Sequence, residues 1–225
     1  MTGLSASLKR RITNDWAAQF PAFSVREPMW LVRRVGPLVQ GIYLKRNRGN
    51  DAYVPVLHIS NLSVSRETLP LSMYTELRTA TTLAPDVVRA AGHVERFENL
   101  VARLRQQSPL PLEGSISVDA ALRAISQCMD APHRYSPIHL REDILCLLNW
   151  CGRTDEARVE LDRFERDLRS MRAEAPSSSA YQGVDEWAKW CLRNIFDRVQ
   201  LEQVVECESK KFELGHISCI GTLTC

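Results

Sequence analysis

The residues best suited to bind a ligand form a basic segment near the start of the chain. Residues 1–50 contain nine Lys or Arg and two acids, although the whole chain has a net charge of only +2. Such segregation predicts a basic face for an anionic partner, or a basic part that docks on an acidic part of the same chain. The candidate partner-binding residues are Arg33, Arg34, Tyr43, Lys45, Arg46 and Arg48.

Two kinds of partner fit this mixture of cations and a tyrosine. Nucleic acid is one, because basic groups contact phosphates and aromatic rings stack on bases. However, side chains alternate between the faces of a strand, which places Tyr43 and Lys45 on one face and Arg46 on the other. Lysine and arginine also protect strand edges without binding anything. We therefore expect a protein partner, with an acidic surface as the natural complement, and keep nucleic acid as the alternative.

A catalytic alternative rests on His58. An imidazole is the commonest general base near neutral pH, and Asp51 or Asp15 would orient it if the fold brought them together. The sequence contains no GxSxG, HExxH, P-loop or GxGxxG motif. We expect a non-enzymatic protein with no catalytic residue, and an enzyme with dispersed residues around His58 remains an alternative.

One short segment contains the thiols and imidazoles that zinc prefers, namely Cys128, His133, His139 and Cys146. Neither Cys–His pair has the short spacing with which a zinc knuckle presents two ligands together, and Cys146 lies in an apolar helical pattern. Buried thiols and surface histidines explain these residues without a metal. We expect no metal and no cofactor.

The cysteines and the apolar runs indicate where the protein resides. Seven cysteines, an odd number, fall mostly within helical apolar patterns, which predicts reduced thiols that pack as small hydrophobes. No stretch approaches the ~20 apolar residues of a membrane helix. Lys9, Arg10 and Arg11 are not followed by the apolar run of a secretory signal. We expect a cytoplasmic protein without membrane contact.

A helix and a small sheet must position the basic segment. Apolar residues at every fourth position predict a helix over residues 8–20, with Ser7 as its cap. Runs rich in Val, Ile, Leu and Tyr at 30–35, 38–46 and 53–62 predict an antiparallel meander. Pro55 has no N–H to donate, which predicts that the third run lies at a sheet edge or at a bulge.

The remainder of the chain has helical spacing. The pattern predicts a helix behind Pro85 that reaches residue 104, then helices near 117–129, 136–151, 155–171 and 185–206, and a short strand in the tail 212–225. Residues 63–84 have no clear pattern. The helix that ends before Gly152 is apolar around much of its circumference, so Ile144, Leu147 and Leu148 are expected at the centre of the core.

The fold class that follows is α+β. We expect an N-terminal helix and a small antiparallel sheet packed on a C-terminal group of about five helices. At 225 residues the chain needs only one domain, with a subdivision into an α+β part (1–84) and a mainly helical part (85–225).

Two stretches resemble known families. The sequence LLNWCGRTDEA at 147–157 resembles the turn of a tetratricopeptide hairpin, but it covers one unit, and a solenoid needs about three. An ordinary helical hairpin with a glycine cap is the simpler interpretation. The initial helix followed by LVRRVGPLVQ at 31–40 resembles small bacterial immunity-type proteins of unknown function. That resemblance implies a protein-binding module, of the kind that neutralises a toxin by binding it.

Overall fold

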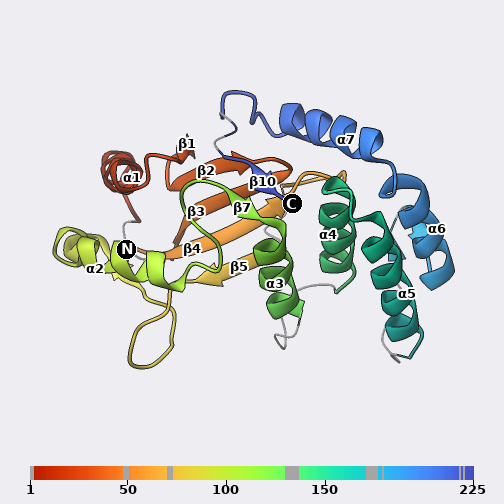
Figure 1. The fold of residues 1–225 in the computed structure, drawn as a ribbon. Helices are drawn as coiled ribbons and strands as arrows, with labels where there is room; N and C mark the ends of the chain where they lie inside the picture. The colour runs from red at the N-terminus through yellow and green to blue at the C-terminus, as the bar shows by residue number, and fades with distance from the viewer. Residues whose placement is uncertain are drawn as a thin grey trace. The chain divides into compact units, whose positions relative to one another are not determined.

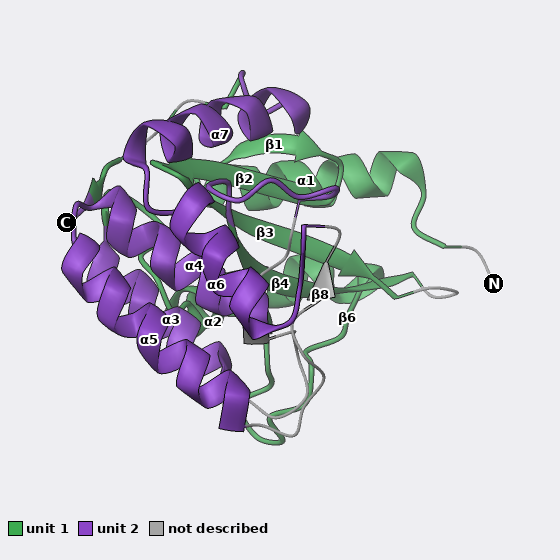
Figure 2. Ribbon diagram, turned by 90° about the vertical axis from the view of Figure 1, so that its right-hand side faces the viewer, with its two compact units in different colours: residues 1–60, 73–116, 216–223 green, residues 61–72, 117–215, 224–225 purple. Residues whose placement is uncertain are grey.

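A computed structural model describes residues 3–47, 51–69, 73–129, 137–170, 177–178, 180–217, 219 and 221–225. The predicted α+β class is confirmed: an N-terminal helix is followed by an antiparallel sheet and then by several helices (Figure 1). The chain divides into two compact units (Figure 2). Unit 1 comprises Met1–Ser60, Met73–Ile116 and His216–Leu223, and unit 2 comprises Asn61–Ser72, Ser117–Gly215 and Thr224–Cys225.

Unit 1 is built on one antiparallel sheet. Its strands are β1 (Ser24–Glu27), β2 (Trp30–Val35), β3 (Leu38–Arg46), β4 (Ala52–Asn61), β5 (Met73–Glu76) and β6 (Val88–Arg89). They follow the order β1-β2-β3-β4-β5, and β6 also pairs with β4. The predicted meander is therefore confirmed as β2–β4. The short strands β1, β5 and β6 lie in segments that were too short or too irregular to show a strand pattern.

Pro55 lies inside the sheet and not at its edge, so of the two predicted positions, a sheet edge or a bulge, the edge was wrong. Strand β4 pairs with β6 through Ala52 and Tyr53, and with β5 from Val56 onward. Pro55 falls between these two paired segments, and its carbonyl accepts from the Leu77 N–H at 2.8 Å. The missing N–H of proline is tolerated because no ladder bond is required at that point.

Helix α1 (Ala6–Gln19) begins at residue 6, whereas the sequence predicted a start at residue 8. The Ser5 hydroxyl accepts from the Leu8 N–H at 3.3 Å, so Ser5 is the N-cap and Ser7 lies within the first turn. Helix α2 (His93–Gln107) follows a single 3₁₀ turn (Ala90–Gly92). The prediction that Pro85 opens this helix was wrong, because Val88 and Arg89 extend to pair with β4.

The core of unit 1 lies between these helices and one face of the sheet. Ile12 and Trp16 of α1, and Leu100 and Leu104 of α2, are almost fully buried. Trp16 stacks on Phe20 with ring centroids 5.9 Å apart. The sheet contributes Leu31, Ile42, Leu44, Tyr53 and Leu57 to the same cluster.

Unit 2 consists mainly of helices: α3 (Val118–Met129), α4 (Pro137–Trp150), α5 (Thr154–Ser170), α6 (Val184–Asn194) and α7 (Arg198–Lys211). Helices α3, α4 and α5 lie side by side (Figure 1). Gly152 has the predicted left-handed conformation, with φ 72°, in the turn from α4 to α5. The predicted core positions Ile144, Leu147 and Leu148 are confirmed as buried.

The last predicted helix is two helices. The Asp197 side chain accepts from the N–H groups of Val199 and Gln200, which caps a new helix and ends the predicted continuity of 185–206. The predicted tail strand is confirmed as β10 (Leu223–Thr224), which pairs with β7 (Ile116–Ser117). A short hairpin pairs β8 (Ser177–Ser178) with β9 (Tyr181–Gln182). Among the described residues, no helix has the length and apolarity to cross a membrane.

The prediction that all seven cysteines are reduced was wrong for two of them. Cys151, at the end of α4, forms a disulfide with Cys225, which is 74 positions further along the chain. Cys146 and Cys191 are free and buried, and burial raises the pKa of each thiol. Only the folded tail brings Cys225 to Cys151, which spacing along a helix does not reveal.

Candidate functional site

The structure divides the predicted basic segment instead of gathering it. In the register of β2 and β3, Arg33 pairs with Gln40 and Arg34 pairs with Val39, so the two arginines occupy opposite faces of the sheet. Tyr43 is half-buried, and Lys45 and Arg46 are exposed. Arg48 lies outside the described residues.

Arg33 is an interior residue of unit 1. Its side chain is fully buried and donates to Gln40 Oε1 at 2.8 Å, to the Gly114 carbonyl at 2.9 Å and to the Pro111 carbonyl at 2.5 Å. Burial lowers the pKa of the guanidinium, and the charge of Glu113 opposes that shift. Arg33 therefore ties the loop at 111–114 to the sheet and offers no charge to a partner.

Two further cations of the segment already have partners. The Lys45 ammonium lies 2.9 Å from Glu76 Oε1 and 5.5 Å from the centre of the Tyr74 ring. Hydrogen bonding to Tyr74 and to Glu76 raises the pKa of Lys45. Arg34 donates from Nε to the Gly36 carbonyl at 3.1 Å. Arg46 is the predicted cation whose side chain has no hydrogen bond or ion pair within the described part of the chain.

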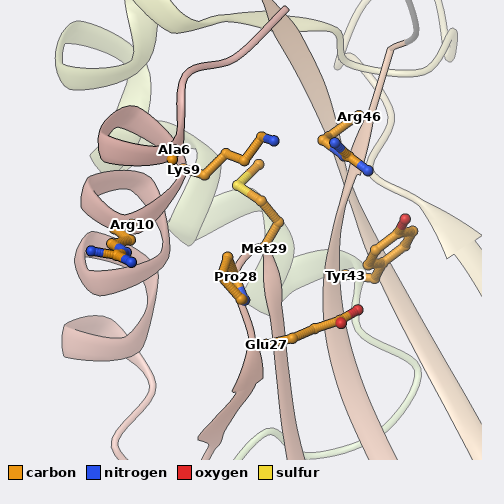
Figure 3. A pocket seen from close by; sticks show the side chains of 8 residues that line it. All are labelled: Ala6, Lys9, Arg10, Glu27, Pro28, Met29, Tyr43 and Arg46. Atoms are coloured by element: carbon orange, nitrogen blue, oxygen red, sulfur yellow. The ribbon is translucent and has the colours of Figure 1, made fainter.

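Arg46 lines a cleft of about 300 Å³ together with residues that are distant in the sequence (Figure 3). Lys9 reaches into it from α1 and is directed toward the Arg46 side, whereas Arg10 points away from the cleft. Tyr43 forms a wall from β3, and Met29 lies between the two sides. The complete lining is Ala6, Lys9, Arg10, Glu27, Pro28, Met29, Tyr43 and Arg46. We call this the Lys9–Arg46 cleft.

The floor of the cleft is held in an unusual backbone conformation. Met29 has φ 74°, in the left-handed region that non-glycine residues rarely adopt. Its N–H donates to the Thr13 hydroxyl of α1 at 2.8 Å, and its carbonyl accepts from the Leu44 N–H of β3 at 2.8 Å. Because these bonds fix the Met29 backbone from both sides, α1 and β3 are held at a defined distance across the cleft.

The lining of the cleft has more cations than acids, and these charges are not paired with one another. Within the described residues, Lys9, Arg10, Arg46 and Glu27 form no ion pair. Lys9 also lies in the first turn of α1, a turn without an acid, although the N-terminus of a helix is itself positive. Helices α2, α3, α5 and α6 each have an acid in their first turn, whereas α4 and α7, like α1, have none. The arrangement favours a negatively charged group in the cleft.

His58 is enclosed and is not in contact with the proposed aspartates. It is fully buried, and Trp30 Nε1 donates to His58 Nε2 at 2.7 Å. Nδ1 has no hydrogen-bond partner among the described residues. Burial, and then the charge of Arg26, lower the pKa of His58 to about 3. A Cβ at Gly41 would overlap the imidazole, so the glycine provides its space. His58 is therefore neutral, and its enclosed position is that of a structural residue.

Asp15 instead contacts His93, which sequence reasoning missed. Asp15 Oδ2 lies 3.0 Å from His93 Nε2, His93 Nδ1 lies 2.7 Å from the Tyr53 hydroxyl, and Trp16 Nε1 donates to that hydroxyl at 3.4 Å. This series of contacts has the order of a catalytic triad, with a hydroxyl, an imidazole and a carboxylate. However, Tyr53 is fully buried and burial raises its pKa, so no substrate reaches its oxygen. The array joins α1, β4 and α2.

Unit 2 contains a buried carboxylate with a full set of donors. Glu142 of α4 accepts from the Tyr181 hydroxyl at 2.7 Å, from Arg66 at 3.2 Å and from Trp187 Nε1 at 3.3 Å. Burial opposes its ionisation, but the neighbouring His139 side chain and the charge of Arg66 prevail and lower the pKa of Glu142. We call these residues the Glu142 network. The run Arg141-Glu142-Asp143 within an apolar helix was the sequence signal for it.

A second cleft, of about 400 Å³, lies in unit 2 between the segment 63–67 and helices α6 and α7. Its two cations are already paired, because Arg66 contacts Glu142 and Lys211 lies 3.5 Å from Glu208. The Ser65 hydroxyl and the Arg66 N–H also donate to Glu208. This cleft is therefore nearly balanced in charge, unlike the Lys9–Arg46 cleft.

The residues weighed as zinc ligands do not converge on one site where the structure describes them. His139 Nδ1 lies 2.6 Å from the Arg66 guanidinium, and Cys146 is buried in α4. His133 lies outside the described residues. In the part of the chain that is described, no three His, Cys, Asp or Glu side chains converge as metal ligands. Searches of protein-family models, curated proteins and solved structures find no match to this chain.

Proposed function

We propose that the protein is a non-enzymatic binding module that recognises an acidic segment of a protein partner through the Lys9–Arg46 cleft. The observation that carries the proposal is the pair of cations that flank an open cleft without any ion pair among the described residues. A partner carboxylate would supply the missing counter-charge. The half-buried ring of Tyr43 would provide apolar contact beside it, as in interfaces that combine an anchor with a charged rim.

A protein partner accounts for the distribution of charge better than nucleic acid does. Binding a nucleic-acid backbone needs several cations that follow a line of phosphates. Arg33 is interior and Lys45 is paired with Glu76, which removes two of the predicted contacts from any such line. The cleft retains a few cations within about 300 Å³, a size that suits one or two side chains.

The type of binding module is an extension of this proposal. The resemblance to small bacterial immunity-type proteins supports a role in which the partner is a toxin and binding neutralises it. The cytoplasmic location expected from the sequence stays a prediction. The disulfide between Cys151 and Cys225 argues against it, because disulfides rarely persist in a reducing cytosol.

The test is to capture the partner from the native host and then to measure its affinity directly. A bait that carries Lys9→Glu and Arg46→Glu should fail to capture a protein that the parent captures. The purified partner should also bind this double variant more weakly than it binds the parent. Arg89→Glu with Lys189→Glu makes the same change in net charge at exposed positions outside the cleft, and should retain the partner.

Salt dependence separates the two classes of partner. Counterion release makes nucleic-acid affinity fall steeply with salt, whereas surface ion pairs contribute only ~0 to 1 kcal/mol each. Submicromolar binding to DNA or RNA at physiological salt, weakened by the double cleft variant, would overturn the proposal. So would a partner that the double cleft variant binds as tightly as the parent does.

A further inference from the structure

The Lys9–Arg46 cleft contains one acid, and that acid does not neutralise the cations. Glu27 lines the cleft, is exposed, and forms no ion pair within the described residues. Figure 3 shows its carboxylate well separated from the Lys9 ammonium and from the Arg46 guanidinium, with Met29 and Tyr43 at intermediate positions. The cleft therefore has a cationic end and an anionic end.

Local structure fixes the position of Glu27. The pairing of β1 with β2 shifts between Val25 and Glu27, which sets Glu27 opposite Trp30 at the end of the hairpin. A bulge of this kind redirects a side chain. Pro28 and the left-handed Met29 follow immediately and restrict the backbone of the turn. Glu27 thus ends strand β1 next to a constrained turn at the cleft.

We propose that Glu27 biases the specificity of the cleft, so that it prefers a segment in which an acid is accompanied by a base over a continuous polyanion. The inference rests on the proposed function. The acid of the partner meets Lys9 and Arg46, while its base meets Glu27. A run of acids, or a chain of phosphates, would place a second negative charge against Glu27. Repulsive contacts of this kind are a common source of discrimination between partners.

The test compares short labelled peptides of equal length by fluorescence anisotropy at low salt. One peptide alternates Glu and Lys, and the other replaces each Lys by Glu. The measured quantity is the ratio of the affinity for the mixed peptide to the affinity for the acidic peptide. This ratio should be higher for the parent than for a Glu27→Gln variant. Because one exposed charge pair is worth up to about 1 kcal/mol, Glu27→Gln should change this ratio by about twofold to fivefold. Glu27→Lys should shift it further toward the acidic peptide and should increase binding to single-stranded DNA.

Matched variants separate failure of this inference from failure of the proposed function. Glu98→Gln removes an exposed acid from α2 of the same unit and should leave the ratio unchanged. If Lys9→Ala with Arg46→Ala weakens peptide binding but the Glu27 variants leave the ratio unchanged, only the role of Glu27 is overturned. If the parent binds neither peptide, or if the double alanine variant binds both as the parent does, the cleft itself is overturned as the binding site. Thermal melts should show that every variant is folded.

Discussion

The Glu142 network and the Lys9–Arg46 cleft place charges in opposite situations. Glu142 is buried in unit 2 and accepts hydrogen bonds from Tyr181, Trp187 and Arg66. Lys9 and Arg46 line an open cleft in unit 1 and form no ion pair among the described residues. A buried charge must be compensated within the fold, whereas an exposed one is compensated by water or by a partner. The first arrangement therefore serves stability and the second is available for binding.

Removing the centre of the buried network should have the largest effect on stability. Glu142→Ala leaves the Arg66 charge and two buried donors without their acceptor, and we expect a loss of about 3–5 kcal/mol in the free energy of unfolding. Glu142→Gln keeps an oxygen acceptor and should cost less. Urea denaturation measures both, with Glu27→Ala in the cleft as the exposed control. An alanine variant as stable as the parent would remove the contrast between the two regions.

Two arginines of the same basic segment provide a matched pair. Arg33→Ala leaves the buried Gln40 Oε1 without its donor and releases the loop carbonyls at 111 and 114, and an unsatisfied buried group costs about 1–3 kcal/mol. Arg46→Ala removes an exposed side chain and should change stability by less than about 0.5 kcal/mol. Equal losses in urea denaturation would show that Arg46 also has a structural role.

His58 adds a third situation, a buried group that remains neutral. Its pKa is lowered to about 3, whereas an unfolded histidine titrates near pH 6.5. Between these values the unfolded chain binds the additional proton, so the contribution of His58 to stability decreases as pH falls, by up to about 1.4 kcal/mol per pH unit.

Other groups also titrate in this range, so the measurement is a difference between two proteins. A Gln side chain differs from histidine in shape, but His58→Gln offers the Trp30 N–H an oxygen acceptor that does not titrate in this pH range. As pH falls from about 6.5, the free energy of unfolding of the parent should decrease more than that of His58→Gln. A difference between the two that is constant with pH would mean that His58 is accessible to protons in the folded state.

The smallest effect concerns Lys9 at the start of α1. A cation in the first turn of a helix opposes the macrodipole, so Lys9→Ala should stabilise the protein by about 0.3–1 kcal/mol at low salt while it weakens partner binding. Lys210 lies in the last turn of α7, where a cation is favourable, and Lys210→Ala should shift stability in the other direction. Thermal melts at low and high salt detect both shifts, which should shrink with added salt. A destabilised Lys9→Ala variant would assign Lys9 to the fold.

The sequence predicted most of the secondary structure, because periodicity is a local property. Runs rich in Val, Ile, Leu and Tyr at 30–35 and 38–46 predicted β2 and β3, and the apolar circumference of 136–151 predicted the buried positions of α4. It failed where a local pattern competed with an interaction from elsewhere. Pro85 appeared to open a helix, but the residues after it extend to pair with β4.

The candidate site was predicted only in part. Arg46 and Tyr43 were identified from composition and alternation, and the cleft does contain them. Lys9, Glu27 and Met29 were missed because they come from α1, from the end of β1 and from the turn before β2. The charged run in α4 was a usable signal for the Glu142 network, since three charged residues in an apolar helix require internal partners.

The sequence by itself determined which residues are apolar at helical or strand spacing, and hence the α+β class. The tertiary structure decided which charges are paired. Arg33 and Arg46 are identical in type and belong to neighbouring strands, yet one is bound to carbonyls at 111 and 114 and the other faces an open cleft. Burial periodicity depends on a few consecutive residues, whereas the pairing of charges and of Cys151 with Cys225 depends on distances in space between segments far apart in the chain.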